Sequence, residues 1–516
     1  MSNIQTMTFG RVIEANERHR PNHVALIHGD RSVTFGEFAS RSRQLASALN
    51  LAGVSHQDRM AVLSMNSIEQ CEIYGAAELA GYVAVGVNFR LIGKEIAYQL
   101  KDCAARVLLF QARYTDIVDS MREQLDSVVR YICIGEDTPD WADEYEAFLA
   151  TGAPEGVPFR AQEEDIAYLV YTSGTTGRPK GCMLGHRSQL FTIRGCSAAL
   201  GINRTDRVLV VMPLFHVGGK VVLLSAHWQG ATCVLLDQFE PENYLQTMQD
   251  QRITVGHLAP PMILSLLDSP LAGKLDFSAL RVILYSAASM PNEVLRKAMK
   301  VFGQVFQQQY GLTESAGLSL HRLEHDPDGD DIVQKRMRSI GIPFAGVELR
   351  IADDDGNPLP TGEPGEILLK SPGNMIGYWN DSGASIAALK GGWLRTGDVG
   401  KLDEDGYCYL VDRKKDMIVS GGENIYSREV EEVLFAHPAI LEASVIGVPD
   451  EKWGESVRAV VVVREGQSLT EDDIFAHCRE MLASYKKPRS VIFIDELPRL
   501  ANGKFDKVTI RKQYSS

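Results

Sequence analysis

Glycines, hydroxyl side chains and one lysine are concentrated between Tyr171 and Gly181, in the string YTSGTTGRPKG. The glycines leave room for a backbone to close around an oxyanion, while the hydroxyls and Lys180 supply donors and positive charge. An apolar run at residues 166–170 precedes the string, and a strand followed by a glycine-rich turn directs backbone N–H groups at phosphate oxygens. The spacing differs from the P-loop, in which glycine, lysine and Ser/Thr are contiguous. A surface loop can share this composition, but the pattern predicts a phosphate-binding loop of another kind.

The complete string resembles the nucleotide-phosphate signature of the adenylate-forming superfamily, which includes acyl-CoA synthetases, stand-alone adenylation domains and beetle-type luciferases. By this resemblance the loop holds the β- and γ-phosphates of ATP, and Thr175 places its hydroxyl on a Mg²⁺ ion. Lys180 would anchor the loop or contact pyrophosphate. The resemblance also implies CoA as co-substrate and a large N-terminal domain that carries a small mobile C-terminal one.

A carboxylate suited to a hard cation ends the segment Tyr310-Gly311-Leu312-Thr313-Glu314. An isolated Thr-Glu pair more often begins a helix, yet carboxylate oxygen is the ligand that Mg²⁺ prefers. The segment resembles the family's adenine and metal segment, in which the tyrosine stacks on adenine and the glutamate ligates Mg²⁺. We therefore expect Glu314 to share the ion with Thr175.

An imidazole, His216, follows the apolar run at residues 208–212. A single histidine beside core residues is usually a packing group, but the corresponding aromatic residue of the family orients the substrate carboxylate. The small-residue turn at 286–291 resembles the family's adenine turn, with alanine and serine in place of glycines, and Ala288 is assigned to it. The acyl pocket is expected near His216, Ala226, His257 and Ala288. Lys220 is expected to point to solvent rather than into this pocket.

Four charged residues toward the C-terminus complete the resemblance. Asp398 resembles the ribose ligand, because a carboxylate can accept both ribose hydroxyls, and Arg413 resembles the residue that reaches the same ribose. Lys415 lies at the position of the family's pivot. Lys504, in PRLANGK, resembles the catalytic lysine that bridges the substrate carboxylate and the α-phosphate, although Asn502 replaces the more frequent threonine. Without the resemblance, Asp398 would be interpreted as a turn residue, Arg413 and Lys415 as solvated surface charges, and Lys504 as part of a polar C-terminal segment.

The predicted CoA site follows from the same resemblance. Rotation of the C-terminal domain would withdraw Lys504 and present the glycine-containing segment at 420–424 to the thiol, because adjacent glycines leave room for a pantetheine arm. The predicted CoA contacts are Ser420, Gly421, Gly422 and Tyr485. The predicted ATP and AMP contacts are Thr172, Ser173, Gly174, Thr175, Thr176, Gly177, Lys180, Ala288, Gln309, Tyr310, Gly311, Thr313, Asp398, Arg413 and Lys504, and the predicted catalytic residues are Thr175, His216, Glu314 and Lys504.

Length and composition bound the class of protein. The 516 residues suggest roughly two to four folding units, and contents of 45% hydrophobic and 23% charged residues are ordinary globular values. A formal net charge of −14 argues against general binding to nucleic acids or anionic membranes. Eight scattered cysteines without a Cys-x-x-Cys pair, no apolar leader and no membrane-length apolar run predict a cytoplasmic protein with reduced thiols.

Helical and short apolar segments alternate along the chain, which predicts an α/β layered fold. Up to about residue 160, helices are expected at 38–51 and 67–79 and strands at 60–63, 83–89 and 107–110. A second α/β subunit is expected at 161–340, with strands at 207–212, 231–236 and 281–285 and helices at 241–251 and 291–301. Short strands and turns predict a small β-rich unit at 341–411. The charge cluster at 412–416 is the predicted hinge, which separates an N-terminal AMP-binding domain at 1–411 from an α+β lid domain at 417–516.

The motifs bear on three possible functions. The motifs favour an ATP-dependent, AMP-forming acyl-CoA synthetase that acts on a small carboxylic acid, and the resemblance is compatible with a homodimer. The alternative is a stand-alone adenylation enzyme that loads an aryl or other non-amino acid onto a carrier protein. Amino acids are disfavoured because residues 217–236 contain no carboxylate to pair with an ammonium group. A nucleotide-binding regulator without turnover is disfavoured because Glu314 and Lys504 are both present.

Overall fold

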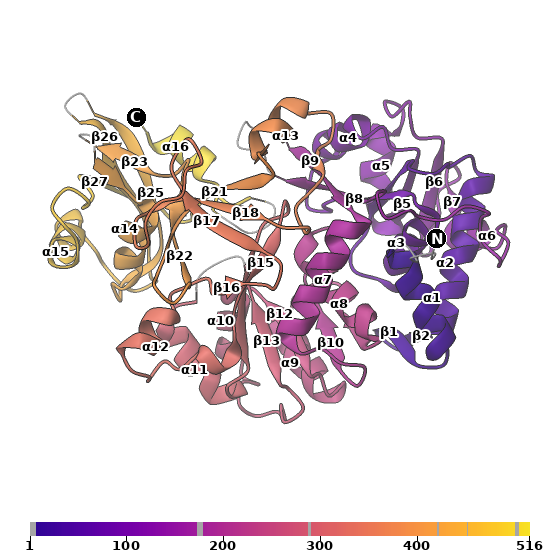
Figure 1. Cartoon of the computed structure of the whole chain (residues 1–516), viewed down its shortest axis with the longest axis horizontal. Coiled ribbons are helices and arrows are strands. Elements are labelled where there is room, and N and C mark those ends of the chain that lie inside the picture. Colours follow the sequence, from indigo (N-terminus) through magenta and orange to yellow (C-terminus); the bar gives the residue numbers. More distant parts are fainter. Residues whose placement is uncertain are drawn as a thin grey trace. The chain divides into compact units, whose positions relative to one another are not determined.

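The computed structural model describes residues 7–172, 179–286, 290–420, 423–450, 453–500 and 505–515 (Figure 1). The chain divides into two compact units, one formed by Met1–Leu349 with Leu369–Leu394 and the other by Arg350–Leu368 with Arg395–Ser516. The division therefore lies within the segment expected to be β-rich. The predicted boundaries at 411 and 417 stay a prediction.

The first unit contains an eight-stranded sheet in the order β19-β9-β8-β4-β3-β5-β6-β7. Its strands from β8 to β7 are parallel, and β9 and β19 extend it antiparallel beyond β8. The strands are β3 (Arg59–Leu63), β4 (Val83–Gly86), β5 (Val107–Gln111), β6 (Arg130–Ile134), β7 (Asp143–Glu144), β8 (Ile166–Thr172), β9 (Lys180–Gly185) and β19 (Gly377–Tyr378). The accompanying helices are α1 (Phe9–His19), α2 (Phe35–Leu51), α3 (Ile68–Ala80), α4 (Gly93–Asp102), α5 (Thr115–Arg122), α6 (Tyr145–Leu149) and α13 (Ser382–Ala388).

A nine-stranded sheet completes the first unit, in the order β16-β15-β14-β13-β12-β10-β11-β1-β2. Its six central strands, β14 to β1, are parallel. Strands β15 and β2 pair antiparallel with the outermost of these, β14 and β1, and β16 pairs antiparallel with β15. The strands are β1 (Val24–His28), β2 (Arg31–Thr34), β10 (Arg207–Val210), β11 (Thr232–Leu235), β12 (Val255–Leu258), β13 (Val282–Tyr285), β14 (Phe306–Gly311), β15 (Ala316–Leu320) and β16 (Ile342–Pro343). The helices are α7 (His186–Leu200), α8 (Val217–Gln229), α9 (Pro241–Asp250), α10 (Pro260–Asp268), α11 (Asn292–Phe302) and α12 (Asp331–Arg336).

One apolar core joins the two sheets of this unit. It includes Leu26 and Val208 from the nine-stranded sheet and Val62 and Tyr168 from the eight-stranded one, all fully buried or nearly so. Helix α2 packs on α3, and α7 packs on α8. The two layered subunits expected from the sequence therefore share this core, and each sheet also has a hydrophobic cluster of its own.

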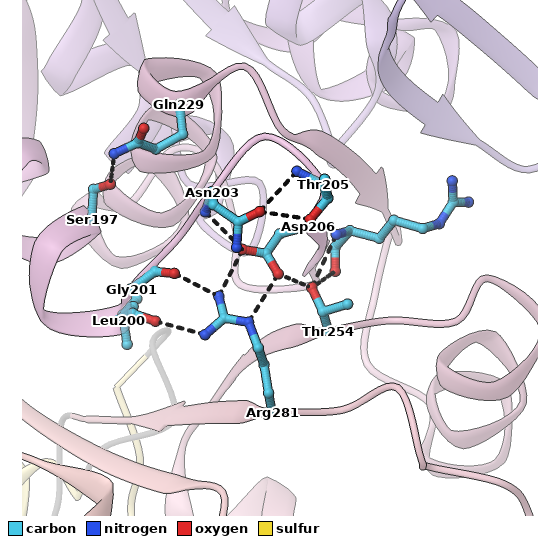
Figure 2. A network of polar contacts seen from close by, with 10 residues as sticks. Ser197, Leu200, Gly201, Asn203, Thr205, Asp206, Gln229, Thr254 and Arg281 are labelled. Carbon is cyan, nitrogen blue, oxygen red and sulfur yellow. Dashed lines mark hydrogen bonds and ion pairs between the residues drawn. The ribbon is translucent and has the colours of Figure 1, made fainter.

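Asp206 fastens the starting ends of three parallel strands (Figure 2). It directly precedes β10, and its carboxylate accepts hydrogen bonds from the Arg281 guanidinium at 2.7 and 3.0 Å and from Thr254 Oγ1 at 2.7 Å. Thr254 and Arg281 directly precede β12 and β13. The network thus sets the register of the strands whose opposite, carboxyl ends carry candidate site residues.

The second unit contains part of the β-rich segment and the C-terminal α+β segment. Strands β17 (Glu348–Ala352), β18 (Gly365–Lys370), β20 (Leu389–Lys390), β21 (Trp393–Leu402) and β22 (Cys408–Arg413) belong to a five-stranded sheet through which the division between the units runs. A further sheet has the order β24-β23-β26-β25, with β27 on β26. Its elements are β23 (Ile418–Ser420), β24 (Glu423–Ile425), α14 (Ser427–Phe435), β25 (Ile440–Asp450), β26 (Gly454–Val463), α15 (Glu471–Met481), β27 (Ser490–Phe493) and α16 (Lys507–Tyr514).

The expected α/β class is confirmed, while some boundaries differ. Helix α2 begins before residue 38 because Thr34 and Glu37 form a capping box. The strand expected at 83–89 ends at Gly86, although burial continues to Val87. The apolar run at 83–89 thus indicates which residues are buried, but not where strand pairing ends. Among the described residues, no helix has the length and apolar character needed to cross a bilayer.

Candidate functional site

Part of the predicted site lies outside the described residues. These residues are Ser173, Gly174, Thr175, Thr176, Gly177, Ala288, Gly421, Gly422 and Lys504. The two ends of the phosphate-binding string are described. Thr172 ends β8 and Lys180 begins β9, and the two residues are antiparallel partners. The string therefore connects two paired strands at the carboxyl end of β8.

Lys180 is held by residues on the segment around β19. Its Nζ lies 3.4 Å from the Asp381 carboxylate and 5.4 Å from the centroid of the Tyr378 ring. Lys180 is largely buried, with 22% of its side chain exposed. These contacts engage the charge of Lys180 at the start of β9, and its role as a loop anchor or pyrophosphate contact stays a prediction.

The segment expected to bind adenine and metal lies where β14 ends. Gln309, Tyr310 and Gly311 are its last residues, and Thr313 and Glu314 lie in the tight connection to β15, in which Leu312 N donates to Ser315 O at 2.6 Å. Gly311 is required by close packing, since a Cβ atom there would lie 2.7 Å from the Cβ of Ala316. Ligands of α/β sheets bind outside the carboxyl ends of parallel strands, so the segment occupies a suitable position.

The Glu314 carboxylate has one oxygen fixed. Its Oε1 accepts a hydrogen bond from the Tyr378 hydroxyl at 2.8 Å, and its backbone carbonyl accepts one from Met375 N, also at 2.8 Å. In the described part of the chain, the second carboxylate oxygen accepts no hydrogen bond. The side chain thus offers one hard oxygen ligand in a defined orientation.

This single carboxylate fits a magnesium ion that arrives with a nucleotide. The described residues contain no cluster of three or more His, Cys, Asp or Glu side chains that could hold a metal by themselves. Mg²⁺ is usually bound by one or two carboxylates together with substrate phosphates rather than by an all-protein cage. Glu314 would supply the protein oxygen, and Thr175, the second predicted ligand, lies outside the described residues.

His216 caps the N-terminus of α8. Its Nδ1 accepts a hydrogen bond from Gly218 N at 3.1 Å, so the proton of the neutral ring is on Nε2. The helix begins after β10, at the carboxyl edge of the nine-stranded sheet. His216 is therefore suited to donate a hydrogen bond from Nε2 to a substrate carboxylate.

A second imidazole lies beside it. His257, in β12, is 3% exposed, and its Nε2 is 2.8 Å from Ser286 Oγ at the end of β13. A Cβ atom on Gly218 would lie 3.4 Å from both imidazole rings, so the glycine separates them. Burial, with a smaller contribution from His216, lowers the pKa of His257 to about 4. His257 is consequently neutral at pH 7, and the structure brings together two residues expected near the acyl pocket.

In the second unit the two predicted ribose ligands are partners on neighbouring strands. Asp398 in β21 pairs with Arg413 in β22, and Arg413 Nε lies 3.2 Å from Asp398 Oδ1. The aspartate is 2% exposed, whereas 46% of the arginine side chain is exposed. An ion pair of this kind holds the carboxylate in one orientation while leaving the guanidinium accessible to a ligand.

The predicted pivot and CoA residues are also in this unit. Lys415 is exposed, although partial desolvation lowers its pKa, and its backbone carbonyl accepts a hydrogen bond from Arg511 Nη2 at 3.3 Å. Ser420 ends β23 and pairs with Glu423 across a hairpin. Tyr485 is exposed at 43%. Their predicted roles as pivot and CoA contacts stay predictions.

The expectation that Lys220 points to solvent is wrong. The residue is 2% exposed, and its Nζ lies 4.1 Å from the ring centroids of both Tyr74 and Tyr168. Helix α8 is apolar nearly all round after His216, which is the pattern of a buried helix. That pattern could have indicated that Lys220 is buried.

Family comparisons agree with this geometry. The family model described as AMP-binding enzyme matches residues 13–379, and that of the AMP-binding enzyme C-terminal domain matches residues 429–504. The feruloyl-CoA synthase of Amycolatopsis sp is 35% identical over 96% of this chain and 97% of its own. The long-chain-fatty-acid–CoA ligase FadD13 of Mycobacterium tuberculosis is 34% identical over 94% of each chain.

Solved structures agree as well. The anthranilate CoA ligase AuaEII, in complex with anthranoyl-AMP, superposes with a TM-score of 0.89 and 29% identity, covering 98% of this chain and 97% of its own. The match confirms the predicted class of a large N-terminal domain with a smaller C-terminal one. The chain therefore belongs to the AMP-binding enzyme family, the adenylate-forming superfamily that its motifs resemble.

Proposed function

We propose that this protein is an AMP-forming carboxylate–CoA ligase. In the first step a carboxylate oxygen of the substrate forms a bond to the α-phosphorus of ATP, and the bond from that phosphorus to pyrophosphate breaks. In the second step the sulfur of the CoA thiolate attacks the carbonyl carbon of the acyl-adenylate, and AMP leaves with the electrons of the broken C–O bond. The products are acyl-CoA, AMP and pyrophosphate.

The observation that carries this proposal is the arrangement at the carboxyl edge of the nine-stranded sheet. His216, after β10, and the Tyr310 to Glu314 segment, at the end of β14, both lie at this edge although they are far apart in the sequence. His216 offers a hydrogen-bond donor for the substrate carboxylate. Glu314, through its hydrogen bond with Tyr378, is linked to the strand in which the phosphate-binding string ends.

Charge compensation explains why these groups are needed. Negative charge increases around the α-phosphorus as the carboxylate approaches and pyrophosphate leaves, and preorganised donors and cations stabilise it. Bound Mg²⁺, with Glu314 and Thr175 as its protein ligands, would neutralise charge on the phosphates. Lys504 would contact the carboxylate and the α-phosphate, while Asp398 and Arg413 would hold the ribose.

The site must serve two steps in turn. A lysine and a thiol cannot both approach the same reacting carbon and phosphorus, so the catalytic lysine must withdraw before CoA reacts. We propose that the chain turns at Lys415 after the first step and that Ser420, Gly421, Gly422 and Tyr485 then contact CoA. Loading of a carrier protein is not favoured, since the relatives reported above are named CoA ligases.

Pyrophosphate exchange tests the proposal. The purified protein would be incubated with ATP, Mg²⁺, labelled pyrophosphate and one acid at a time, using ferulate, anthranilate and medium- and long-chain fatty acids. These acids follow the names of the relatives. Exchange with at least one acid is expected, and adding CoA should give the corresponding thioester. A thioester formed only on a carrier protein, or no exchange with any acid, would refute the assignment.

Replacing one lysine separates the two steps. We expect Lys504→Ala to reduce adenylate formation by about 10²-fold or more, the usual effect of removing a group that meets transition-state charge. The same variant should still convert a supplied acyl-adenylate and CoA to acyl-CoA at the wild-type rate. An equal loss in both steps would contradict the role assigned to Lys504.

A further inference from the structure

A short strap, residues 375–381, connects two parts of the proposed nucleotide site. At one end Met375 N donates to the Glu314 carbonyl at 2.8 Å. In its middle, β19 pairs with β9, and Ile376 N and Trp379 N donate to Met183 O and Gly181 O at 2.9 and 2.7 Å. The strap therefore joins the segment that carries Glu314 to the strand that follows the phosphate-binding string.

Tyr378 lies at the centre of this strap. Its hydroxyl donates to Glu314 Oε1 at 2.8 Å, and its ring lies 5.4 Å from Lys180 Nζ. Its backbone N–H donates to Ser385 Oγ at 2.8 Å, which ties the residue to α13. The backbone of Tyr378 is consequently held by β9 on one side and by α13 on the other.

A phenol held in this way restricts the Glu314 carboxylate. A free glutamate side chain samples several rotamers, and its terminal torsion is broad. A charge-assisted hydrogen bond to one oxygen selects one orientation, and the second oxygen is then directed elsewhere. Partners that orient a metal-ligating carboxylate typically change metal affinity or activity by about 10–100-fold when they are removed.

We propose that Tyr378 is a positioning residue that holds the Glu314 carboxylate in the orientation in which its second oxygen meets the Mg²⁺ of bound MgATP. The inference rests on the proposed function and extends it to a residue outside the motifs. Because the strap also engages Lys180, it would set the distance between the metal carboxylate and the phosphate-binding string.

The test replaces only the hydroxyl. Tyr378→Phe keeps the ring beside Lys180 and the backbone pairing of the strap. Mn²⁺ binding to the protein with a non-hydrolysable α,β-methylene ATP analogue would be titrated by electron paramagnetic resonance, and metal-free AMP binding would be measured by calorimetry. We expect Mn²⁺ to bind about 10-fold or more weakly, with AMP affinity within about twofold of wild type.

Two further variants sharpen the result. Tyr131→Phe, in β6, removes another half-buried phenol, whose hydroxyl donates to the backbone oxygen of Arg122 at 3.0 Å. This variant should bind Mn²⁺ as the wild type does. In the background of Glu314→Gln, adding Tyr378→Phe should cause no further loss, because the phenol acts through the carboxylate. Wild-type Mn²⁺ affinity in Tyr378→Phe, an equal loss of AMP affinity, or additive losses in the double variant would each overturn the inference.

Failure of the inference differs from failure of the proposed function. If the wild-type protein shows no pyrophosphate exchange with any acid, the proposed function fails. If wild-type exchange and Mn²⁺ binding are present and Tyr378→Phe leaves both unchanged, only the role of Tyr378 is refuted.

Discussion

Lys220 and Glu78 are two buried ionisable residues that interact through their charges without a hydrogen bond between them, and their effect on stability can be worked out. Glu78, in α3, is 5% exposed, and one of its oxygens accepts a hydrogen bond from the Tyr168 hydroxyl. Burial raises the pKa of Glu78 to about 7 from 4.5, although Tyr168 and Lys220 act in the opposite direction. Burial lowers the pKa of Lys220 to about 7 from 10.5, opposed by Glu78.

These two pKa shifts act on stability over separate pH ranges. The raised pKa of Glu78 means that its contribution is present below pH 4.5 and is lost as the pH rises through 7. The lowered pKa of Lys220 means that its contribution is present above pH 10.5 and is lost as the pH falls through 7. At about 1.4 kcal/mol per pH unit, the limits are about 3 kcal/mol for Glu78 and about 5 kcal/mol for Lys220. The pair should destabilise the fold most near pH 7.

A double variant tests this reasoning. Glu78→Gln with Lys220→Met keeps an acceptor for Tyr168 and a side chain of similar length between the tyrosine rings, but removes both titrations. The free energy of unfolding of this variant should exceed that of the wild type by the largest amount near pH 7. The advantage should fall by up to about 3 kcal/mol toward pH 4.5 and by up to about 5 kcal/mol toward pH 10.5.

Urea unfolding followed by tryptophan fluorescence is a suitable assay. Trp141, Trp228, Trp379 and Trp393 lie in the first unit with the pair, and only Trp453 lies in the second. The exposed pair Glu348 and Lys370, 3.1 Å apart, provides a control. Its double replacement should change stability by less than about 1 kcal/mol at every pH. If the difference in free energy of unfolding between the wild type and the variant at Glu78 and Lys220 does not change from pH 5 to 10, the reasoning is refuted.

Two other predictions concern single aspartates. Asp206→Ala leaves the donors of Arg281 and Thr254 without their acceptor, and should lower the free energy of unfolding by about 2–4 kcal/mol. This loss is slightly smaller than that caused by breaking a fully buried ion pair, because 31% of the Arg281 side chain is exposed. Thr205→Ala, at the exposed rim of this network, should stay within about 0.5 kcal/mol in the same urea titration. Asp398→Asn should weaken AMP binding about 10-fold or more in calorimetry, since hydrogen bonds to a charged group contribute about 1.5–3 kcal/mol. If Asp398→Asn weakens the binding of 2′,3′-dideoxy-AMP, which lacks the ribose hydroxyls, as much as it weakens the binding of AMP, Asp398 is not the ribose ligand.

Much of the fold was readable from the sequence because its signals are local. The capping box of Thr34 and Glu37 begins α2, and Ser67 with Gly81 bounds α3, so these helices are defined by residues adjacent to them. The alternation of short apolar runs with amphipathic helices likewise predicts parallel sheets without knowledge of long-range contacts. The motif strings carry the family resemblance for the same reason.

The tertiary structure decided which side chains act on one another. The apolar pattern of α8 could indicate that Lys220 is buried, but its neighbours are evident only from the fold, in which α3 contributes Glu78 and Tyr74 and β8 contributes Tyr168. Tyr378 belongs to no motif singled out from the sequence, yet β19 brings its hydroxyl to Glu314. Side-chain ionisation and orientation depend on neighbours from distant segments, since desolvation and hydrogen bonding act through space. The sequence alone therefore determined the elements and the family, whereas sheet pairing determined the environment of each functional group.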